Sequence, residues 1–433
     1  MENTEISINN TFSFIHTADL HLDSPFTGIT RIDPKIGKKL IKSTFQAYET
    51  IIDLCIEKKV DFLLIAGDIY DSADKSLYAQ LKFISGLKKL SNAGISTYIA
   101  HGNHDPLNSW SASLEWPENV FIMNGDCVNT FSHKKNQTIV TRITGISYSH
   151  QHITSNLTEN FPHKEEDDPF TIGLLHCTIG TNTGHEPYAP CTIQDLKDLK
   201  YDYLALGHIH TTSIVNDSDP VIIYPGNPQG RHTGEPGPRG CYLVTVDQNR
   251  SISTKFIETD NIRWFIEEIS IEEIPTEQEL LDKIIDHTES IATNAKGRSV
   301  ICRYILTGRG PLHTTLAKEG VLNDIVTHLR EEEISSSVWI EQLVDNSRRL
   351  IDRNMLLKRN DFTGDIVRLV DELSVHEKSL KSIEKSLEPL FASTRAKKIL
   401  KKIDHEELTD LINQAEDILL NKIIIEDEDE HEH

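Results

Sequence analysis

The chain has 433 residues, 38% of them hydrophobic, and its formal net charge is −23 at pH 7. This size and apolar content predict two or three domains with sizeable cores and exclude a disordered protein. The negative charge argues against a protein that grips a phosphate backbone unaided, although the acidic run 426–433 contributes part of it.

Features of export and membrane insertion are not found in the sequence. No stretch approaches the roughly 18 uninterrupted apolar residues of a membrane helix. Residues 1–10 are polar, unlike the basic start and apolar body of a signal peptide. The six cysteines are scattered without a C-x-x-C pair. We therefore expect a cytoplasmic protein with reduced thiols and no membrane contact.

The first hundred residues follow a β-α-β-α-β order. Strands are predicted at 12–19, 62–66 and 96–100, and helices at 33–59, with Asp33-Pro34 as its start, and at 77–90. Short apolar runs predict further strands at 143–147, 170–175, 203–206, 221–224, 241–246 and 254–257. This order predicts an α/β fold with a mostly parallel sheet and helices on its faces.

Composition changes near residue 260, so we place the first domain at 11–260. Residues 261–345 read as a small α+β domain with helices at 277–291 and 314–329. Residues 346–425 have apolar positions at helical spacing and predict a helical region, in which Pro389 marks a break between two helical units. Residues 426–433 are predicted to be a disordered acidic tail.

Polar side chains follow the predicted strands at the points where these strands end. Because the carboxyl ends of parallel strands meet at one edge of a sheet, we expect these side chains to lie close together. The set consists of Asp19, His21, Asp68, Asn103, His176, His208 and His210.

This mixture of carboxylate, amide and imidazole groups suits a pair of divalent cations. Two cations about 3.5–4 Å apart can stabilise both the attacking and the leaving oxygen of a phosphoester. Asp68 has two carboxylate oxygens and can bridge the two ions. No cysteine accompanies the set, which favours manganese, iron or zinc over a soft-metal site. A single histidine at a strand end is usually only hydrogen-bonded, but five such motifs in this order indicate a metal centre.

The motifs resemble those of the calcineurin-like metallophosphoesterases. The matching segments are Asp19-x-His21, Gly67-Asp68-x-x-Asp71, Gly102-Asn103-His104-Asp105, His176 and Gly207-His208-x-His210. The segment from His16 to Phe26 is similar to the DNA-exonuclease branch that contains SbcD, and to the bacterial YhaO proteins within it. The resemblance implies a β-sandwich flanked by helices, with 261–345 as a capping domain.

The resemblance also assigns roles to these residues. It implies one metal ion held by Asp19, His21, Asp68 and His210. It implies a second ion, most simply also Mn²⁺, held by Asp68, Asn103, His176 and His208. His104 would meet the leaving-group oxygen, and Asp105 would orient its ring. Asp71 would contact the metal ligands without binding a metal ion itself, because some nucleases of this branch have histidine at the equivalent position.

Three functions remain open from the sequence. The first is a manganese-dependent DNA exonuclease in DNA repair, whose region 346–425 docks an SbcC-like ATPase and which can form a homodimer. The second is a phosphatase or phosphodiesterase for small substrates, which the acidic charge favours. The third is a scaffolding subunit of an ATPase complex. Arg231 could meet a phosphate, and Trp110 and Trp116 either stack on bases or belong to the core.

Overall fold

The computed structural model describes residues 11–26, 34–72, 75–180, 188–332, 337–375, 377–391, 403 and 405–429. Internal contacts divide the chain into two compact units. One unit holds Met1–Ile266, His287–Arg303 and Glu333–Glu341, and the other holds Glu267–Asp286, Tyr304–Glu332 and Gln342–His433. The domain limits at 260 and 345 stay predictions.

The first unit contains two six-stranded sheets. The first sheet has the order β12-β11-β1-β2-β3-β4, in which β1 to β4 are parallel and β11 and β12 are antiparallel. Its strands are β1 (Phe12–Thr17), β2 (Phe62–Ala66), β3 (Ser96–Ala100), β4 (Val120–Ile122), β11 (Gly240–Val246) and β12 (Ile252–Glu258).

The second sheet has the order β5-β6-β7-β8-β10-β9, with a parallel centre and an antiparallel strand at each edge. Its strands are β5 (Asn129–Lys135), β6 (Thr138–Gly145), β7 (Phe170–His176), β8 (Tyr203–Gly207), β9 (Ser213–Asn216) and β10 (Val221–Tyr224). The α/β sandwich flanked by helices is therefore confirmed.

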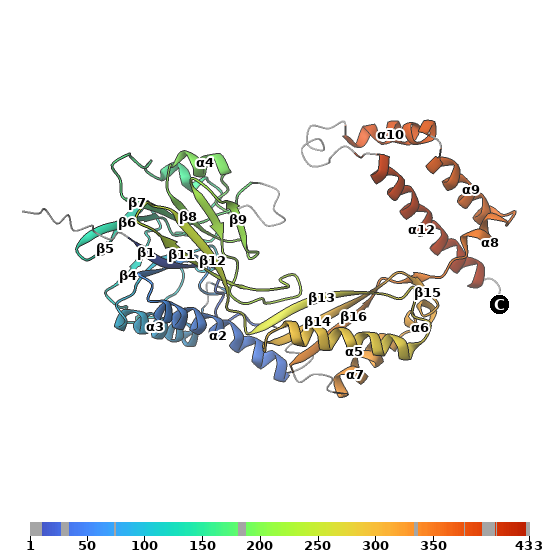
Figure 1. Ribbon diagram of the computed structural model, residues 1–433, viewed down its shortest axis with the longest axis horizontal. Helices are drawn as coiled ribbons and strands as arrows, with labels where there is room; N and C mark the ends of the chain where they lie inside the picture. The colour runs from blue at the N-terminus through green and yellow to red at the C-terminus, as the bar shows by residue number, and fades with distance from the viewer. Residues whose placement is uncertain are drawn as a thin grey trace, which may run out of the picture. The chain divides into compact units, whose positions relative to one another are not determined.

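The central strands are apolar on both faces because each sheet is covered twice. Phe14 and Phe62 of the first sheet face Ile172 and Tyr203 of the second in one core. On the outer face of the first sheet, helices α2 (Pro34–Lys58) and α3 (Leu77–Asn92) bury a second core (Figure 1). The short helix α4 (Ile193–Asp198) covers part of the second sheet through Leu196. Pro34 begins α2 as predicted, and Asp33 lies outside the described residues.

Strands β4, β5 and β9 and helix α4 of the first unit were not predicted from the sequence. Strand β5 reads NTFSHKK and alternates half-buried with exposed residues, while β9 reads SIVN; both lie at edges of the second sheet. Edge strands need few apolar residues, so their sequences carry a weak signal. The remaining two elements, β4 and α4, are short.

A separate three-stranded sheet has the order β13-β14-β16, and a helix follows each of its first two strands. Its strands are β13 (Ile262–Ser270), β14 (Ser299–Thr307) and β16 (Val338–Asp345), and its helices are α5 (Glu277–Asn294), α6 (His313–Leu316) and α7 (Val321–Glu331). The prediction of one helix over 314–329 was wrong. Gly320 adopts a left-handed conformation (φ 88°) and separates α6 from α7. Strand β15 (Arg309–Gly310), between β14 and α6, pairs in parallel with β17 (Arg348–Arg349), which follows β16.

The region beyond residue 345 is helical, as predicted, and its helices pack on one another. They are α8 (Arg353–Leu357), α9 (Phe362–Val375), α10 (Glu377–Phe391) and α12 (His405–Asp429). Val367 and Leu420 share one apolar cluster, and Val370 and Leu408 share another. No described helix is long and apolar enough to cross a membrane.

Two details of this region differ from the prediction. Pro389 lies inside the last turn of α10, and the helix continues through it to Phe391. Helix α12 continues to Asp429, four residues into the stretch predicted to be disordered, and Ile423, which precedes that stretch on the same helix, packs against the Leu356 cluster. Residues 430–433 lie outside the described residues.

Candidate metal centre

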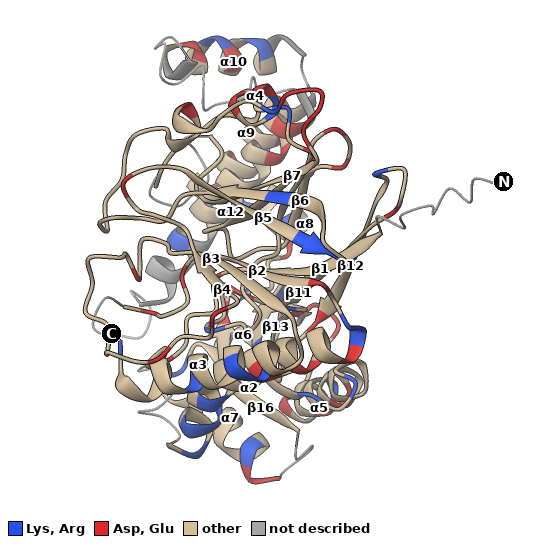
Figure 2. Ribbon diagram, turned by 90° about the vertical axis from the view of Figure 1, so that its left-hand side faces the viewer, with Lys and Arg blue, Asp and Glu red and all other residues tan. Residues whose placement is uncertain are grey.

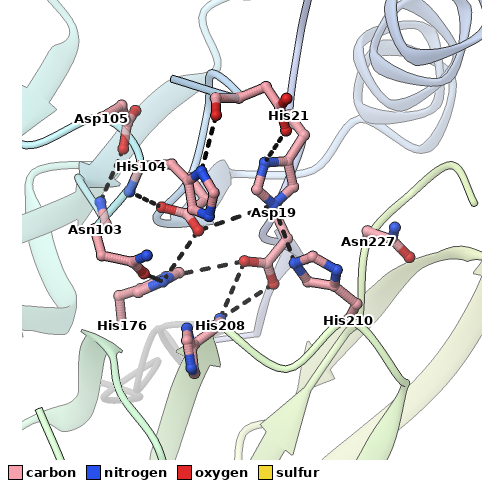
Figure 3. Close-up of polar contacts among 12 residues, drawn as sticks. Asp19, His21, Asn103, His104, Asp105, His176, His208, His210 and Asn227 are labelled. Carbon is pink, nitrogen blue, oxygen red and sulfur yellow. Dashed lines mark hydrogen bonds and ion pairs between the residues drawn. The ribbon is translucent and has the colours of Figure 1, made fainter. Parts of the chain in front are cut away.

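The predicted ligands meet at one edge of the sandwich, where parallel strands of both sheets end. Strands β1, β2 and β3 lead into the loops with Asp19, Asp68 and Asn103, while β7 and β8 lead to His176 and His208. Figure 3 shows the side chains of Asp19, His21 and His176 turned toward a common centre, with His210 opposite Asn103. This is the edge at which α/β sheets collect ligands.

The backbone at this edge adopts conformations that ordinary residues avoid. Asp19, His21 and Asp68 have φ values of 52°, 43° and 51°, and His208 has φ 101°. Non-glycine residues with positive φ are uncommon, and they concentrate where function requires the side chain. Four of the seven predicted ligands therefore stand on strained backbone.

Glycines next to the ligands allow very close packing. A Cβ atom on Gly207 would lie 1.7 Å from the carbonyl oxygen of Ala66, and one on Gly102 would lie 2.2 Å from Oδ1 of Asp68. The motif glycines are thus required by sterics, in addition to their part in the turns.

Asp19, His21 and His210 form the first group of donor atoms, which all lie within 4.8 Å of one another. The Nδ1 of His210 donates to Oε1 of Glu235 at 2.7 Å, and the Nδ1 of His21 lies 3.1 Å from Oδ1 of Asp71. Both contacts favour the proton on Nδ1, so each histidine turns an Nε2 lone pair inward. These two Nε2 atoms are 3.0 Å apart.

The second group surrounds His176. Its Nδ1 donates to the carbonyl oxygen of Ala66 at 2.9 Å, so Nε2 of the neutral ring carries a lone pair. That Nε2 lies 3.0 Å from Oδ1 of Asn103 and 3.4 Å from Oδ2 of Asp68. Three acceptors thus converge on one point, which is the chemistry of a cation site.

The buried carboxylates of both donor groups favour a positive charge beside them. Asp19 and Asp68 are buried carboxylates, exposed by at most 1%. Burial raises the pKa of Asp19 to about 6, and the charge of Asp68 adds to this effect. Burial would also raise the pKa of Asp68, but the charge and hydrogen bond of His176 hold it well below its usual range. Burial lowers the pKa of His176, yet the Asp68 carboxylate outweighs it and raises that pKa to about 9.

Two divalent cations fit this donor set. In both groups, lone pairs and carboxylates face one another at 3.0–3.8 Å, an arrangement that is repulsive unless a cation or a proton lies between them. Oxygen and imidazole donors suit manganese, iron or zinc. Asp68 belongs to a group with Asp19 and His176, and its Oδ2 lies 3.8 Å from Nε2 of His21. Its position between the groups is the one a bridging carboxylate requires.

His208 occupies a different position from the other predicted ligands. Its backbone N–H donates to both oxygens of Asp19 at 3.1 and 3.2 Å, and its ring packs edge-on against His176 with centroids 5.2 Å apart. The donor groups found among the described residues do not include its side chain. The ligand role of His208 stays a prediction.

His104 lies in the loop that follows β3, next to Asn103. Its backbone N–H donates to Oδ1 of Asp68 at 2.9 Å, and its Nδ1 donates to the carbonyl oxygen of Asp71 at 2.8 Å. The ring packs edge-on against His21, with centroids 4.9 Å apart. Nδ1 is engaged in this hydrogen bond, so Nε2 is the free nitrogen of the ring, and in the protonated ring it can give a proton to a group at the centre.

Asp105 does not orient the ring of His104, contrary to our expectation. Its carboxylate accepts from the N–H groups of Ile69 and Gly102 and lies 3.1 Å from Nδ1 of His101. Successive residues in a tight loop point in different directions, so chain neighbours need not be spatial neighbours. Asp105 instead holds the loop, and the main-chain carbonyl of Asp71 orients the ring of His104.

Glu235 is a buried contact of the candidate centre that the sequence did not reveal. It is 4% exposed. Its carboxylate accepts hydrogen bonds from Nδ1 of His210, Nδ2 of Asn227 and the backbone N–H of Arg231, each at 2.7 Å. Burial would raise its pKa, but the hydrogen bonds of His210 and His232 and the charge of Arg231 hold that pKa well below its usual range. Its only sequence signal is an acidic residue in the turn-rich stretch Gly234–Gly240, which gives no hint of burial.

Two other sequence candidates are exposed. Trp110 and Trp116 have 55% and 39% of their surface accessible, so the interpretation that they belong to the core was wrong.

Comparisons with known proteins agree with this geometry. Residues 12–212 match the calcineurin-like phosphoesterases, and residues 264–348 match the middle domain of the metallophosphoesterase YhaO. YhaO of Bacillus subtilis is 33% identical over 96% of this chain and 98% of its own length.

More distant relatives include DNA double-strand break repair proteins. The DNA double-strand break repair protein Mre11 of Methanocaldococcus jannaschii is 25% identical over 82% of this chain and 92% of its own length. For Mre11 of Methanococcus maripaludis, the match is 26% over 49% of this chain and 56% of that protein. A solved dimetal phosphatase from Danio rerio is 12% identical, covers 57% of this chain and 96% of its own, and has a TM-score of 0.37.

Proposed function

Since this chain belongs to the calcineurin-like metallophosphoesterases, we propose that it hydrolyses phosphodiester bonds of DNA at the candidate metal centre, with Mn²⁺ as the cation. The observation that carries the proposal is the convergence of lone pairs and carboxylates in two adjacent groups with His104 beside them. The distant similarity to Mre11 proteins, named for DNA double-strand break repair, supports DNA as the substrate.

Each residue has a defined task in this proposal. Asp19, His21 and His210 hold one cation, while Asn103, His176 and His208 hold the other, and Asp68 bridges them. Bound there, two cations supply the positive charge that a reacting phosphoryl group requires. His104, fixed through Nδ1, presents Nε2 to the oxygen of the departing strand and gives it a proton or stabilises its charge. Asp71 fixes both His104, through its carbonyl oxygen, and His21, through its carboxylate.

The net charge of −23 is the reason to propose a partner. Lysine and glutamate alternate along α10, as Figure 2 shows. Their charges largely cancel, and this helix therefore has little net charge with which to attract DNA. Apolar side chains remain exposed on the neighbouring helices, including Phe362 at 69% and Ile418 at 55%. We propose that region 346–425 docks an SbcC-like ATPase that holds the DNA. A homodimer belongs to the same proposal.

The test is a hydrolysis assay with Mn²⁺ on linear double-stranded DNA, on single-stranded DNA and on a small chromogenic phosphodiester. We expect cleavage of DNA that Asp68→Ala abolishes. Hydrolysis of the small ester alone, with and without an added ATPase partner, would instead support the second candidate, a phosphodiesterase for small substrates, which the negative charge favours.

A further inference from the structure

The contacts behind the first donor group include a cation, Arg231. Its guanidinium Nη1 is paired with Oδ1 of Asp71, and Nη2 lies 3.7 Å from Oε1 of Glu235. Its own backbone N–H donates to Oε2 of Glu235 at 2.7 Å. The side chain is 14% exposed, and the two carboxylates are 22% and 5% exposed. Arg231 therefore lies between two carboxylates at a mostly buried position.

The two carboxylates are those that orient the histidines of the first donor group. Asp71 lies 3.1 Å from Nδ1 of His21, and Glu235 accepts from Nδ1 of His210 at 2.7 Å. The contacts run in series from His21 through Asp71, Arg231 and Glu235 to His210. The Nε2 atoms of the two histidines at the ends of this series are 3.0 Å apart, so the contacts form a ring.

Arg303 of the same unit binds differently. It places Nε and Nη2 on the two oxygens of Glu341 at 2.7 and 2.8 Å. This bidentate pair is the usual arrangement for arginine and one carboxylate. Arg231 instead divides its guanidinium between two carboxylates, which suits a bridge between two elements.

We propose that Arg231 is a positioning residue that ties Asp71 to Glu235 and so fixes the distance between the two histidines that hold the first cation. Asp71 follows β2, whereas Glu235 lies in the loop between β10 and β11. His21 and His210 likewise come from loops of different sheets. The bridge of Arg231 joins these loops directly behind the ligands, and its charge also offsets two neighbouring negative charges. Lysine cannot replace it, because one ammonium group lacks a planar fork that spans both acids.

This inference rests on the proposed metal centre, and its test measures cation binding directly. Mn²⁺ is titrated into the full-length chain, and the free ion is followed by electron paramagnetic resonance. The wild type should bind two ions. Arg231→Gln should weaken one of them by about 10–100-fold, the usual effect of losing a group that orients a ligand, and leave the other within about threefold. Arg231→Lys should bind this ion with an affinity between those of the wild type and Arg231→Gln. Arg303→Gln is the matched control, because it loses an arginine–carboxylate pair away from the ligands, and both of its ions should bind as in the wild type.

The outcomes separate this inference from the proposed function. If Arg231→Gln binds both ions with wild-type affinity and instead raises KM for DNA, Arg231 contacts substrate phosphate and the positioning role is wrong. Equal weakening of both ions would also overturn it. If Arg231→Gln does not fold, Arg231→Lys decides, and wild-type affinity in that variant refutes the need for a fork. A wild type that binds two ions but cleaves no DNA overturns the proposed substrate and leaves the inference on Arg231 intact.

Discussion

Replacement of His104 by asparagine separates catalysis from metal binding. The amide nitrogen of asparagine lies about where Nδ1 of histidine lies, so His104→Asn can keep the 2.8 Å hydrogen bond to the carbonyl oxygen of Asp71. The backbone N–H contact with Asp68 is also kept. What the variant lacks is the Nε2 edge of the ring, the part that we assign to the departing oxygen.

The expected loss follows from that single atom. General-acid groups contribute about 10²–10⁴-fold, which corresponds to roughly 3–5 kcal/mol of transition-state stabilisation. We expect this loss in kcat for DNA, whose departing alkoxide needs a proton. A nitrophenyl phosphodiester has a leaving group that is stable as an anion, so its hydrolysis should fall by about tenfold at most.

The assay compares kcat for both substrates with Mn²⁺ content by elemental analysis. His163→Asn is a matched control, because the Nδ1 of His163 also donates to a backbone carbonyl, that of Asp198, at 2.8 Å, but on the exposed surface. It should retain wild-type rates. A loss of Mn²⁺ in His104→Asn would make His104 a ligand, and equal losses on both substrates would refute its role as an acid.

Three further predictions concern the centre and its support. Asp68→Ala should lose both cations and all hydrolysis, because Asp68 lies between the two donor groups; two Mn²⁺ ions per chain by elemental analysis would contradict the bridging role. Gly207→Ala should lower Tm strongly, by an amount equivalent to about 3 kcal/mol or more, since its Cβ would lie 1.7 Å from the Ala66 carbonyl oxygen; an unchanged melting curve would refute the steric argument. Burial lowers the pKa of His16 from its usual 6.5 to about 3, so unfolded chains bind more protons between pH 3 and 6.5, and stability should be complete above pH 6.5 and fall by about 4 kcal/mol toward pH 3. Denaturant titrations of His16→Gln should show a shallower pH dependence, and an identical dependence would assign the effect to other groups.

Local sequence was sufficient to locate most of the site, because each proposed ligand follows a buried strand within four residues. Apolar runs such as Phe62–Ala66 identify such strands, and the parallel order then implies that their ends meet. The same reasoning could not find Glu235, which follows no strand end of this kind and reaches His210 only through the path of a long loop. It also misassigned Asp105, because the direction of a side chain in a tight loop depends on φ and ψ values that sequence does not show.

The fold shows the same division between local and distant information. Central strands were predicted from apolar runs, and long amphipathic helices from their periodicity. Edge strands such as β5 and β9 were missed, since each is partly solvated and carries only one or two large apolar residues. The break at Gly320 was missed because a glycine within an amphipathic pattern is compatible with both a continuous helix and a left-handed turn.

The positive φ values of Asp19, His21 and Asp68 have a consequence for how this protein can evolve. At each of these positions glycine would adopt the backbone conformation at the lowest energy, whereas phosphoester chemistry needs a carboxylate or an imidazole. Each ligand therefore costs about 1–2 kcal/mol of folding free energy that glycine would avoid. A library selected only for heat resistance should enrich glycine at these three positions and lose the enzyme, while one selected for turnover should restore the ligands and acquire its compensating mutations elsewhere.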